Sequence, residues 1–268
     1  MKVELNYLKS LEENADSYYA LAKKAKKKLS GLESGINKVK SKLESQKNIK
    51  PEKKKLSKKR EKKWFEKFHW FFTGNGFLVV GGRDAKSNEQ VVKKIMQPND
   101  IYFHADIQGA PHTALKTEGK KPAKSDLEEA ASFAAVFSKA WREQLPAIDV
   151  YSAKPEQVSK KAPSGESLGT GAFMVYGKRD WFKRAPLNYA VGLKKKGDSF
   201  ELVPGPLTCV KKNSDFFVEV KFGKDSKGAA SKHIRNFFYQ KTNRVFEASL
   251  DDLNAILPSG SLGVAGKQ

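Results

Sequence analysis

The sequence predicts an α+β protein with a mixed or antiparallel sheet and flanking helices, preceded by a long N-terminal helical arm of the coiled-coil type. In the N-terminal quarter, apolar residues recur in steps of three and four, which is typical of a helix with one apolar seam. Beyond residue 73, short apolar segments of strand length alternate with Gly and Pro turns. Only a few helix-type segments interrupt these strands, and this order favours a single α+β domain.

The boundaries follow from these patterns. We expect a coiled-coil arm at 1–50, a connecting helix at 51–72 that changes from basic to aromatic, the α+β domain at 73–258, and a frayed tail at 259–268.

Charge indicates the class of partner. The 268 residues carry a formal net charge of +21, and residues 1–63 alone hold 20 Lys and Arg against 8 Asp and Glu. A field of this sign favours nucleic acid over an anionic membrane. One cysteine excludes an internal disulfide and a multi-cysteine zinc site, and no run of 18 apolar residues is present. We therefore expect a soluble, cytoplasmic protein that uses no cofactor and contacts no membrane.

The arm has a continuous apolar seam that water cannot cover. Such a seam needs a second helix, so we expect a protein partner, a second copy of the chain, or folding back near Pro51. The residues of the seam are Leu8, Leu11, Ala15, Tyr18, Ala22, Ala25, Leu29, Leu32, Ile36, Val39 and Leu43.

A dense basic run follows the arm. Like charges at this density repel one another unless they meet an anion, so we expect Lys53, Lys54, Lys58 and Arg60 to contact phosphate. Aromatic residues at helical spacing between 64 and 72 predict that the same helix continues and packs its end into the body.

The body is expected to contain nine strands and three helices. Strands are predicted at 77–80, 101–103, 113–115, 148–152, 173–176, 187–193, 200–203, 207–210 and 216–222, and helices at 87–96, 125–141 and 227–239. The second helix is predicted to open with a capping box, Ser125 to Glu128, and to close before Pro146.

The stretch from Asp100 to His112 organises the body. An apolar strand leads to His104, and Gly109 and Pro111 turn the chain so that His112 begins the next strand. A zinc site needs a third ligand that the sequence does not offer, so we expect no metal here. A histidine pair that contacts phosphate or ribose is the favoured use, with acid and base catalysis by His104 and His112 in an RNA-processing enzyme as the alternative.

Basic residues beside flexible turns recur through the body. Arg83 follows Gly82, Lys160 and Lys161 lie in a long loop, and Lys178 and Arg179 follow Gly177. Such turns let the backbone approach a polyanion while the side chain neutralises phosphate. The neighbouring rings of Tyr102, Trp181 and Phe182 are able to stack on exposed bases, which favours RNA over duplex DNA.

Several long motifs resemble the RNA-binding (R) domain of the NFACT family of ribosome quality-control factors. They lie at 63–71, 81–85, 100–105, 157–166 and 171–179, and Ser10, Asn14 and Tyr18 are spaced as in the coiled-coil middle region of the family. The resemblance implies RNA binding at stalled large ribosomal subunits, recruitment of tRNA, and support of untemplated tailing of the nascent chain. Carried over by position, the family's motif residues are Gly82, Arg83, Asp84, Asp100, His104, Gly109, His112, Lys160, Pro163, Gly165, Gly177 and Lys178. We expect the RNA contacts of the body to come from Arg83, Asp84, Asp100, His104, His112, Lys160, Lys161, Lys178 and Arg179, with Gly82, Gly109, Pro163, Gly165 and Gly177 as turn residues.

Two departures from the family are present. Full-length members begin with an N-terminal domain and a helix-hairpin-helix that these residues do not match, so we expect a separately encoded N-terminal half to pair with the arm. Asp180 stands where an asparagine-like residue is expected. We expect no enzyme activity, with large-subunit rRNA and tRNA as partners. A coiled-coil assembly scaffold, whose charge is incidental, is a further alternative.

Overall fold

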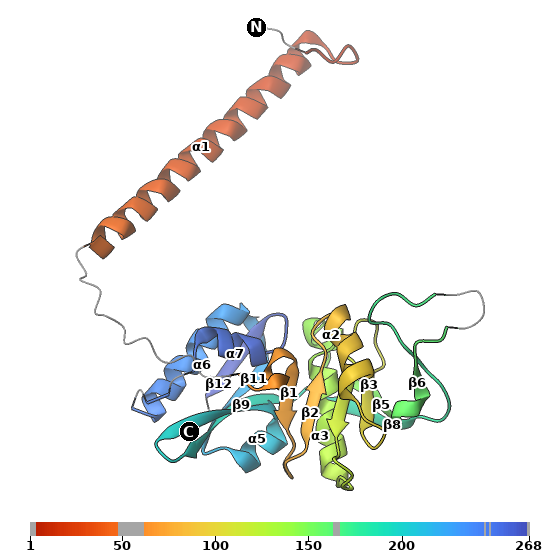
Figure 1. Cartoon of the computed structure of the whole chain (residues 1–268). Helices are drawn as coiled ribbons and strands as arrows, with labels where there is room; N and C mark the ends of the chain where they lie inside the picture. The colour runs from red at the N-terminus through yellow and green to blue at the C-terminus, as the bar shows by residue number, and fades with distance from the viewer. Residues whose placement is uncertain (1–3, 48–61, 163–166, 244, 247, 267–268) are drawn as a thin grey trace. The chain divides into compact units, whose positions relative to one another are not determined.

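The computed structural model describes residues 4–47, 62–162, 167–243, 245–246 and 248–266. The chain divides into two units, residues 1–59 and 60–268 (Figure 1). Across the described ranges, no helix is both long and apolar enough to span a membrane.

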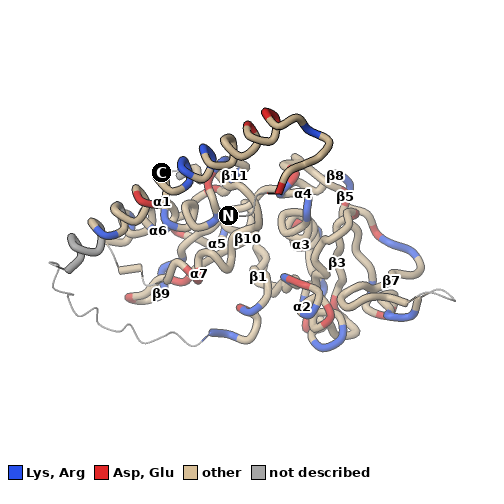
Figure 2. The backbone as a smooth tube through the Cα atoms, turned by 90° about the horizontal axis from the view of Figure 1, so that it is seen from above, with Lys and Arg blue, Asp and Glu red and all other residues tan. Residues whose placement is uncertain are grey.

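The first unit is built on one long helix, α1 (Leu11–Lys47), which confirms the predicted helical arm. Ser10 and Glu13 start the helix, because the Ser10 hydroxyl accepts from the Glu13 N–H (3.1 Å) and the Glu13 carboxylate from the Ser10 N–H (2.8 Å). The preceding loop is held by the Asn14 amide, which donates to the carbonyls of Asn6, Lys9 and Ser10. Lysines recur along α1 among fewer acids (Figure 2).

The apolar seam of α1 is open to solvent. Leu11, Leu32 and Ile36 expose 77%, 65% and 53% of their surface, and no second helix covers them in the described part of this unit. A helical partner for the seam therefore remains a prediction. The basic run that contains Lys53, Lys54, Lys58 and Arg60 lies outside the described residues.

The second unit contains two antiparallel sheets, which confirms the predicted α+β class. The larger has the order β1-β2-β4-β3-β5-β8 and the smaller the order β10-β9-β11-β12, while β6 and β7 form a separate pair. The strands are β1 (His69–Phe72), β2 (Leu78–Gly81), β3 (Ile101–Ala105), β4 (Thr113–Lys116), β5 (Ala147–Ala153), β6 (Val158–Ser159), β7 (Met174–Val175), β8 (Asp180–Pro186), β9 (Tyr189–Lys196), β10 (Ser199–Pro206), β11 (Phe216–Asp225) and β12 (Leu262–Gly266).

The helices fill the space beside the sheets. They are α2 (Ala85–Gln90), α3 (Lys124–Val136), α4 (Lys139–Arg142), α5 (Leu207–Asn213), α6 (Lys227–Lys241) and α7 (Leu250–Ile256), with 3₁₀ turns η1 (Trp64–Lys67) and η3 (Pro155–Gln157) and a π turn η2 (Val91–Ile95). The central helix α3 packs against β3, β5 and β8. Phe103 of β3 belongs to the main core, whereas Tyr102 points to the opposite face of the strand. There Tyr102 lies with Val92 and Val175 in a separate apolar cluster.

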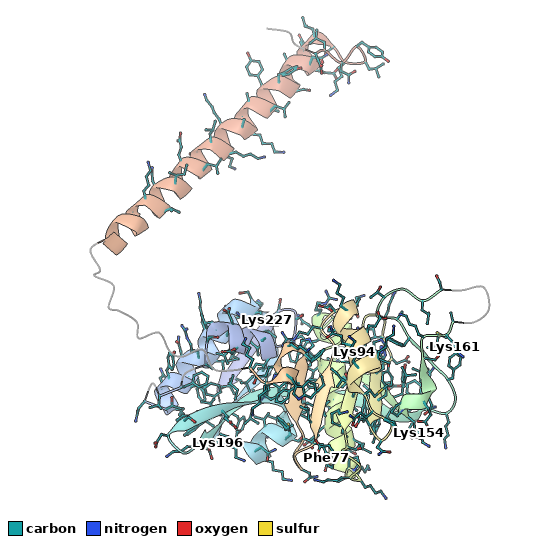
Figure 3. All side chains as sticks on the ribbon, in the orientation of Figure 1. Phe77, Lys94, Lys154, Lys161, Lys196 and Lys227 are labelled. Atoms are coloured by element: carbon teal, nitrogen blue, oxygen red, sulfur yellow. The ribbon has the colours of Figure 1, made fainter. Side chains whose placement is uncertain are left out.

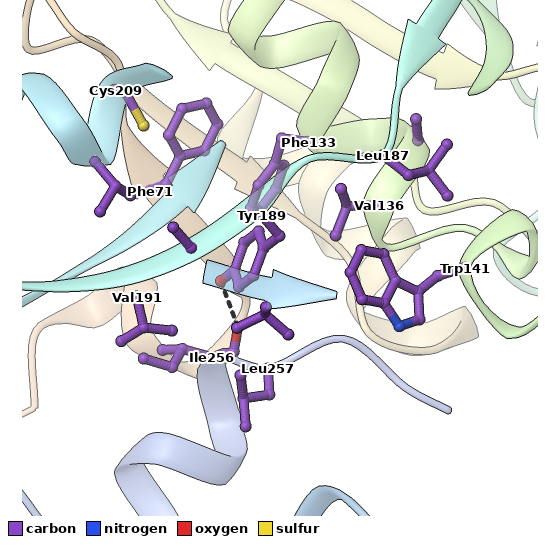
Figure 4. Packing of buried hydrophobic residues seen from close by; sticks show 14 of the residues in the cluster. Phe71, Phe133, Val136, Trp141, Leu187, Tyr189, Val191, Cys209, Ile256 and Leu257 are labelled. Atoms are coloured by element: carbon purple, nitrogen blue, oxygen red, sulfur yellow. Dashed lines mark hydrogen bonds between the residues drawn. The ribbon is translucent and has the colours of Figure 1, made fainter. Parts of the chain in front are cut away.

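One hydrophobic core joins the two sheets. Phe71 of β1 packs on Phe133 of α3, with ring centroids 4.6 Å apart, and Tyr189 of β9 meets Phe137 at 5.5 Å. The Tyr189 hydroxyl donates to the carbonyl of Ile256 at the end of α7 (Figure 4). All of these rings except the half-buried Phe137 are fully enclosed, so the sheets share a single interior.

Three predicted elements are wrong. The aromatic segment 64–72 is not one continuous helix; a short 3₁₀ helix, η1, is followed by β1, because pairing with β2 satisfies the backbone of β1 and aromatic residues suit strands. The segment 207–210 is the start of α5, a helix that buries Cys209 and Val210 on one side. The expected frayed tail contains β12, which pairs with β11 along its length.

The predicted helix at 125–141 is two helices. Helix α3 ends at Val136, and α4 starts again after Ser138, whose hydroxyl accepts from the Ala140 N–H. The expected capping box of Ser125 and Glu128 is replaced by Asp126, whose carboxylate accepts from the Ala123 N–H at 2.9 Å.

Candidate nucleic-acid interface

Four ring side chains lie in one row across adjacent strands of the larger sheet. His104 of β3 is opposite Tyr151 of β5, Tyr151 is opposite Trp181 of β8, and His112 lies beside His104 just before β4. Successive centroids are 5.0 Å (His112–His104), 5.9 Å (His104–Tyr151) and 5.3 Å (Tyr151–Trp181) apart. We call these four side chains the ring row.

The ring row runs from the interior to the surface. His112 and Tyr151 are 5% and 7% exposed, whereas Trp181 is 41% exposed. Aromatic side chains on a sheet are the surface on which many proteins stack unpaired bases. The row therefore has a rigid, buried end that holds its geometry and an open end that is able to meet a ligand.

His112 is locked at the buried end. Its Nε2–H donates to the carbonyl of Gly171 at 2.9 Å, which leaves Nδ1 to accept from the Tyr102 hydroxyl at 2.6 Å. Burial, helped by His104 and Lys160, lowers the pKa of His112 to about 3. Both ring nitrogens are used within the fold, so His112 is a neutral residue that holds the backbone at Gly171.

Acid should destabilise the second unit through His112. The unfolded imidazole takes up its proton near the usual pKa of 6.5, whereas in the fold the pKa is about 3. At a pH between about 3 and 6.5 the unfolded state binds more protons than the folded state. The free energy of unfolding therefore falls as the pH is lowered below the unfolded pKa. We expect this group to contribute a loss of up to about 1.4 kcal/mol per pH unit. Urea unfolding from about pH 7 to about pH 4 measures it.

Two variants separate His112 from the other titrating groups. His112→Phe should be less stable at neutral pH and show a flatter pH dependence, because the titrating ring is gone. Tyr102→Phe removes the hydroxyl that donates to Nδ1 but keeps the imidazole, so it should lose stability and retain most of the slope. An unchanged slope in His112→Phe would refute this assignment.

His104 has one nitrogen available. Its Nδ1–H donates to the carbonyl of Ala105 at 2.7 Å, so Nε2 carries the lone pair. Burial lowers the pKa of His104, and the imidazole is neutral near pH 7. The side chain lines a depression of about 320 Å³ together with Asp106, Gln108, Tyr151 and Arg179.

The cationic side chains near the ring row already contact other groups of the fold. The Arg179 guanidinium lies 4.6 Å from the centre of the Tyr151 ring and donates to the carbonyl of Val175. The Lys160 ammonium donates to the carbonyls of Gly169 and Ala172, so it holds the loop that carries Gly171. Lys183 lies over Trp181 at 4.4 Å and pairs with Asp149.

Lys161 and Lys178 are exposed, and neither ammonium forms an ion pair or hydrogen bond among the described residues. Lys161 lies just beyond β6 (Figure 3). The Gln157 amide ties the neighbouring segment together by donating to the carbonyls of Tyr176 and Lys178, both at 2.7 Å. An ordered backbone therefore carries both lysines, and their ammonium groups are able to bind an anionic partner.

Three predicted site residues hold the framework. The Arg83 guanidinium donates to the carbonyls of Glu66 and Phe68, and burial lowers its pKa. Asp84 starts α2 by accepting from the Ser87 N–H at 2.8 Å. Asp100 is 4% exposed, pairs with Lys116 and accepts two backbone N–H groups, so the predicted contact of Asp100 with RNA does not fit its burial.

The predicted turn glycines act in two ways. Gly82 lies against Asn88, and a Cβ atom built there would be 2.0 Å from the Asn88 Oδ1 atom. Gly109 and Gly177 have positive φ, +80° and +79°, as turn residues often do. Pro163 and Gly165 lie outside the described residues.

Sequence reasoning missed Tyr151 and Gly171 as parts of the site. Tyr151 lies in a predicted strand, and the alternation of that strand places Tyr151 on the same face as Asp149. The residues opposite Tyr151, His104 and Trp181, depend on the order of the strands, which the sequence does not give. Among the residues described, no three His, Cys, Asp or Glu side chains are grouped as metal ligands.

Comparisons with known proteins identify the class. Residues 67–177 match the family model described as the NFACT protein RNA binding domain. The archaeal Rqc2 homologue aRqcH of Methanocaldococcus jannaschii is 38% identical over 209 residues, which cover 78% of this chain and 30% of that protein. The ribosome quality control complex subunit NEMF homologue of Drosophila melanogaster is 43% identical over 139 residues, 51% of this chain and 14% of that protein.

A solved C-terminal structure of the fibronectin/fibrinogen-binding protein from Streptococcus suis covers 67% of this chain and 78% of its own, with a TM-score of 0.38 and 18% identity. The family match at residues 67–177 lies within the second unit, which therefore contains an RNA-binding domain of the NFACT type. The chain contains the NFACT RNA-binding domain and is related to the C-terminal part of the ribosome quality-control proteins named above. It spans less than a third of the length of the curated relatives reported above.

Proposed function

We propose that this chain is the RNA-binding part of a ribosome-associated quality-control factor and binds large-subunit rRNA or tRNA at stalled ribosomes. The observation that carries the proposal is the ring row, together with two exposed lysines, Lys161 and Lys178, whose ammonium groups have no partner among the described residues, in a domain of the NFACT RNA-binding type. The names of the archaeal and Drosophila relatives support the setting. A cytoplasmic location follows from that role.

The contacts have separate tasks in this proposal. Lys161 and Lys178 neutralise phosphates and supply affinity that depends on salt. Trp181, at the open end of the ring row, supplies a face for an unpaired base. Arg83, Asp84 and Lys160 contribute indirectly, because their side chains hold the backbone that presents the others.

The exposed apolar seam of α1 is a second binding surface, for a protein helix. We propose that a helix from an N-terminal NFACT half, or from a second copy, covers Leu11, Leu32 and Ile36, and that this assembly supports tailing of the nascent chain. The chain acts as a binding component and not as an RNA-processing enzyme, since His112 has no free ring nitrogen.

Reversing two charges should test the RNA surface. We expect Lys161→Glu/Lys178→Glu to weaken binding to purified large ribosomal subunits and to tRNA by about tenfold or more, and to reduce the salt slope by about 1.4 to 1.8. Each lost phosphate contact accounts for about 0.7 to 0.9 of that slope. Binding is measured by sedimentation and by fluorescence anisotropy across a salt series.

The matched control is Lys194→Glu/Lys195→Glu. These exposed lysines lie on β9 of the smaller sheet, and the double variant changes the net charge by the same amount. It should retain the slope and most of the affinity. Equal losses in both variants would show that only net charge matters, and no loss in either would place RNA binding elsewhere.

A further inference from the structure

Two hydrogen-bond acceptors, on His104 and Asp106, line the depression together with the side chains of Gln108 and Arg179. His104 Nε2 carries a lone pair because Nδ1 is committed as a donor to Ala105. Asp106 is exposed on the turn after β3, and its carboxylate has no partner among the described residues, while its backbone N–H is bound to Asp149. A neutral imidazole nitrogen and a carboxylate therefore line the same hollow.

The wall of the depression is flat and cationic. Tyr151 forms part of the wall, and the Arg179 guanidinium lies over its ring at 4.6 Å. Guanidinium planes and aromatic rings are the groups on which proteins stack unpaired bases. A volume of about 320 Å³ lies at the lower end of the range for ligand sites, so the hollow suits one small planar group.

We propose that this depression binds one unpaired nucleobase that carries an exocyclic amino group. The amino group donates to His104 Nε2 or to the Asp106 carboxylate, and the ring lies against Tyr151 and Arg179. This inference rests on the proposed function and adds base selectivity to it.

The acceptor lining distinguishes cytosine from uracil. Cytosine presents an amino donor at position 4, where uracil presents a carbonyl acceptor. The uracil carbonyl would face another acceptor, the His104 Nε2 atom or the Asp106 carboxylate. Neither atom of such a pair carries a hydrogen, so no hydrogen bond forms and both groups stay unpaired. The two bases are otherwise similar in size, so they form a matched pair of probes.

The experiment compares labelled oligocytidylate and oligouridylate of about ten nucleotides. Fluorescence anisotropy of the whole chain at fixed salt should give about fivefold to tenfold tighter binding of the cytidine oligomer. His104→Phe keeps a ring in the row but removes the acceptor, and Asp106→Asn replaces a carboxylate oxygen by an amide donor. Each should bring the ratio of the two affinities towards one. His104→Phe should bind the uridine oligomer about as well as the wild type, and Asp106→Asn should bind it at least as tightly.

Asp198→Asn is the control, because it makes the same charge change in the turn between β9 and β10. It should keep the wild-type ratio. If the ratio in His104→Phe and in Asp106→Asn equals that of the wild type while all proteins bind RNA, the base pocket is rejected and the proposed function stands. If the wild type binds neither oligomer, nor ribosomal subunits, nor tRNA, both are rejected.

Discussion

Replacing Asp100 by alanine should lower the free energy of unfolding of the second unit by about 3–5 kcal/mol. The carboxylate accepts from the N–H groups of Gln97 and Thr117 at 2.7 and 3.0 Å and pairs with the Lys116 ammonium. The Lys116 side chain is only 11% exposed, so the variant would leave a buried cation beside two unsatisfied N–H groups. Urea unfolding followed by circular dichroism measures the loss.

The comparison for Asp100→Ala is an exposed ion pair. Glu143 pairs with Lys139 at 2.9 Å on the surface of α4, where both side chains are about half exposed. Glu143→Ala should cost no more than about 0.5 kcal/mol. If Asp100→Ala were equally mild but weakened RNA binding, then the earlier prediction of an RNA contact would regain support.

Gly82→Ala should destabilise the second unit by about 3 kcal/mol, near the upper end of the usual cost of overpacking. The new Cβ atom would lie 2.0 Å from the Asn88 Oδ1 atom and 2.7 Å from its backbone nitrogen. The side chain of Asn88 accepts from the His112 N–H, so relief of this overlap would move the residue that anchors the buried end of the ring row. Thermal unfolding and RNA binding should therefore both change.

Gly228 provides the control for Gly82. It lies in the first turn of α6, and nothing stands within 4 Å of an added Cβ atom. Gly228→Ala should be neutral or raise stability by up to about 1 kcal/mol. Equal stability of the two variants would contradict the close packing of Gly82 on Asn88.

The sequence predicts best what depends on local pattern. The apolar seam of α1 repeats along one helix, so its period is visible without any tertiary information. The turn that brings His104 and His112 together is also local, and its glycine adopts the positive φ that turns require. Strand segments such as β3 and β5 were predicted within two residues of their ends for the same reason.

What the sequence could not predict depends on partners distant in the chain. The aromatic residues at 64–72 fit a helical spacing as well as a strand, and only the neighbouring β2 decides between them. The resemblance places Asp100 among the RNA contacts, and its burial against Lys116 becomes visible only through the pairing of β3 with β4. Trp181 and Tyr151 are 30 positions apart, and only the pairing of β5 with β8 makes them neighbours.

The shared core of the two sheets sets the smallest part of the chain that folds cooperatively. The family match ends at residue 177, yet Phe133, which lies within the match, packs with Phe137 in the same interior as Tyr189 and Val191, which lie beyond it. A fragment cut at that boundary would expose this interior and lose β8, the outer strand of the larger sheet. We therefore expect the unit that unfolds cooperatively to differ from the segment that matches the family model, and to extend through β12.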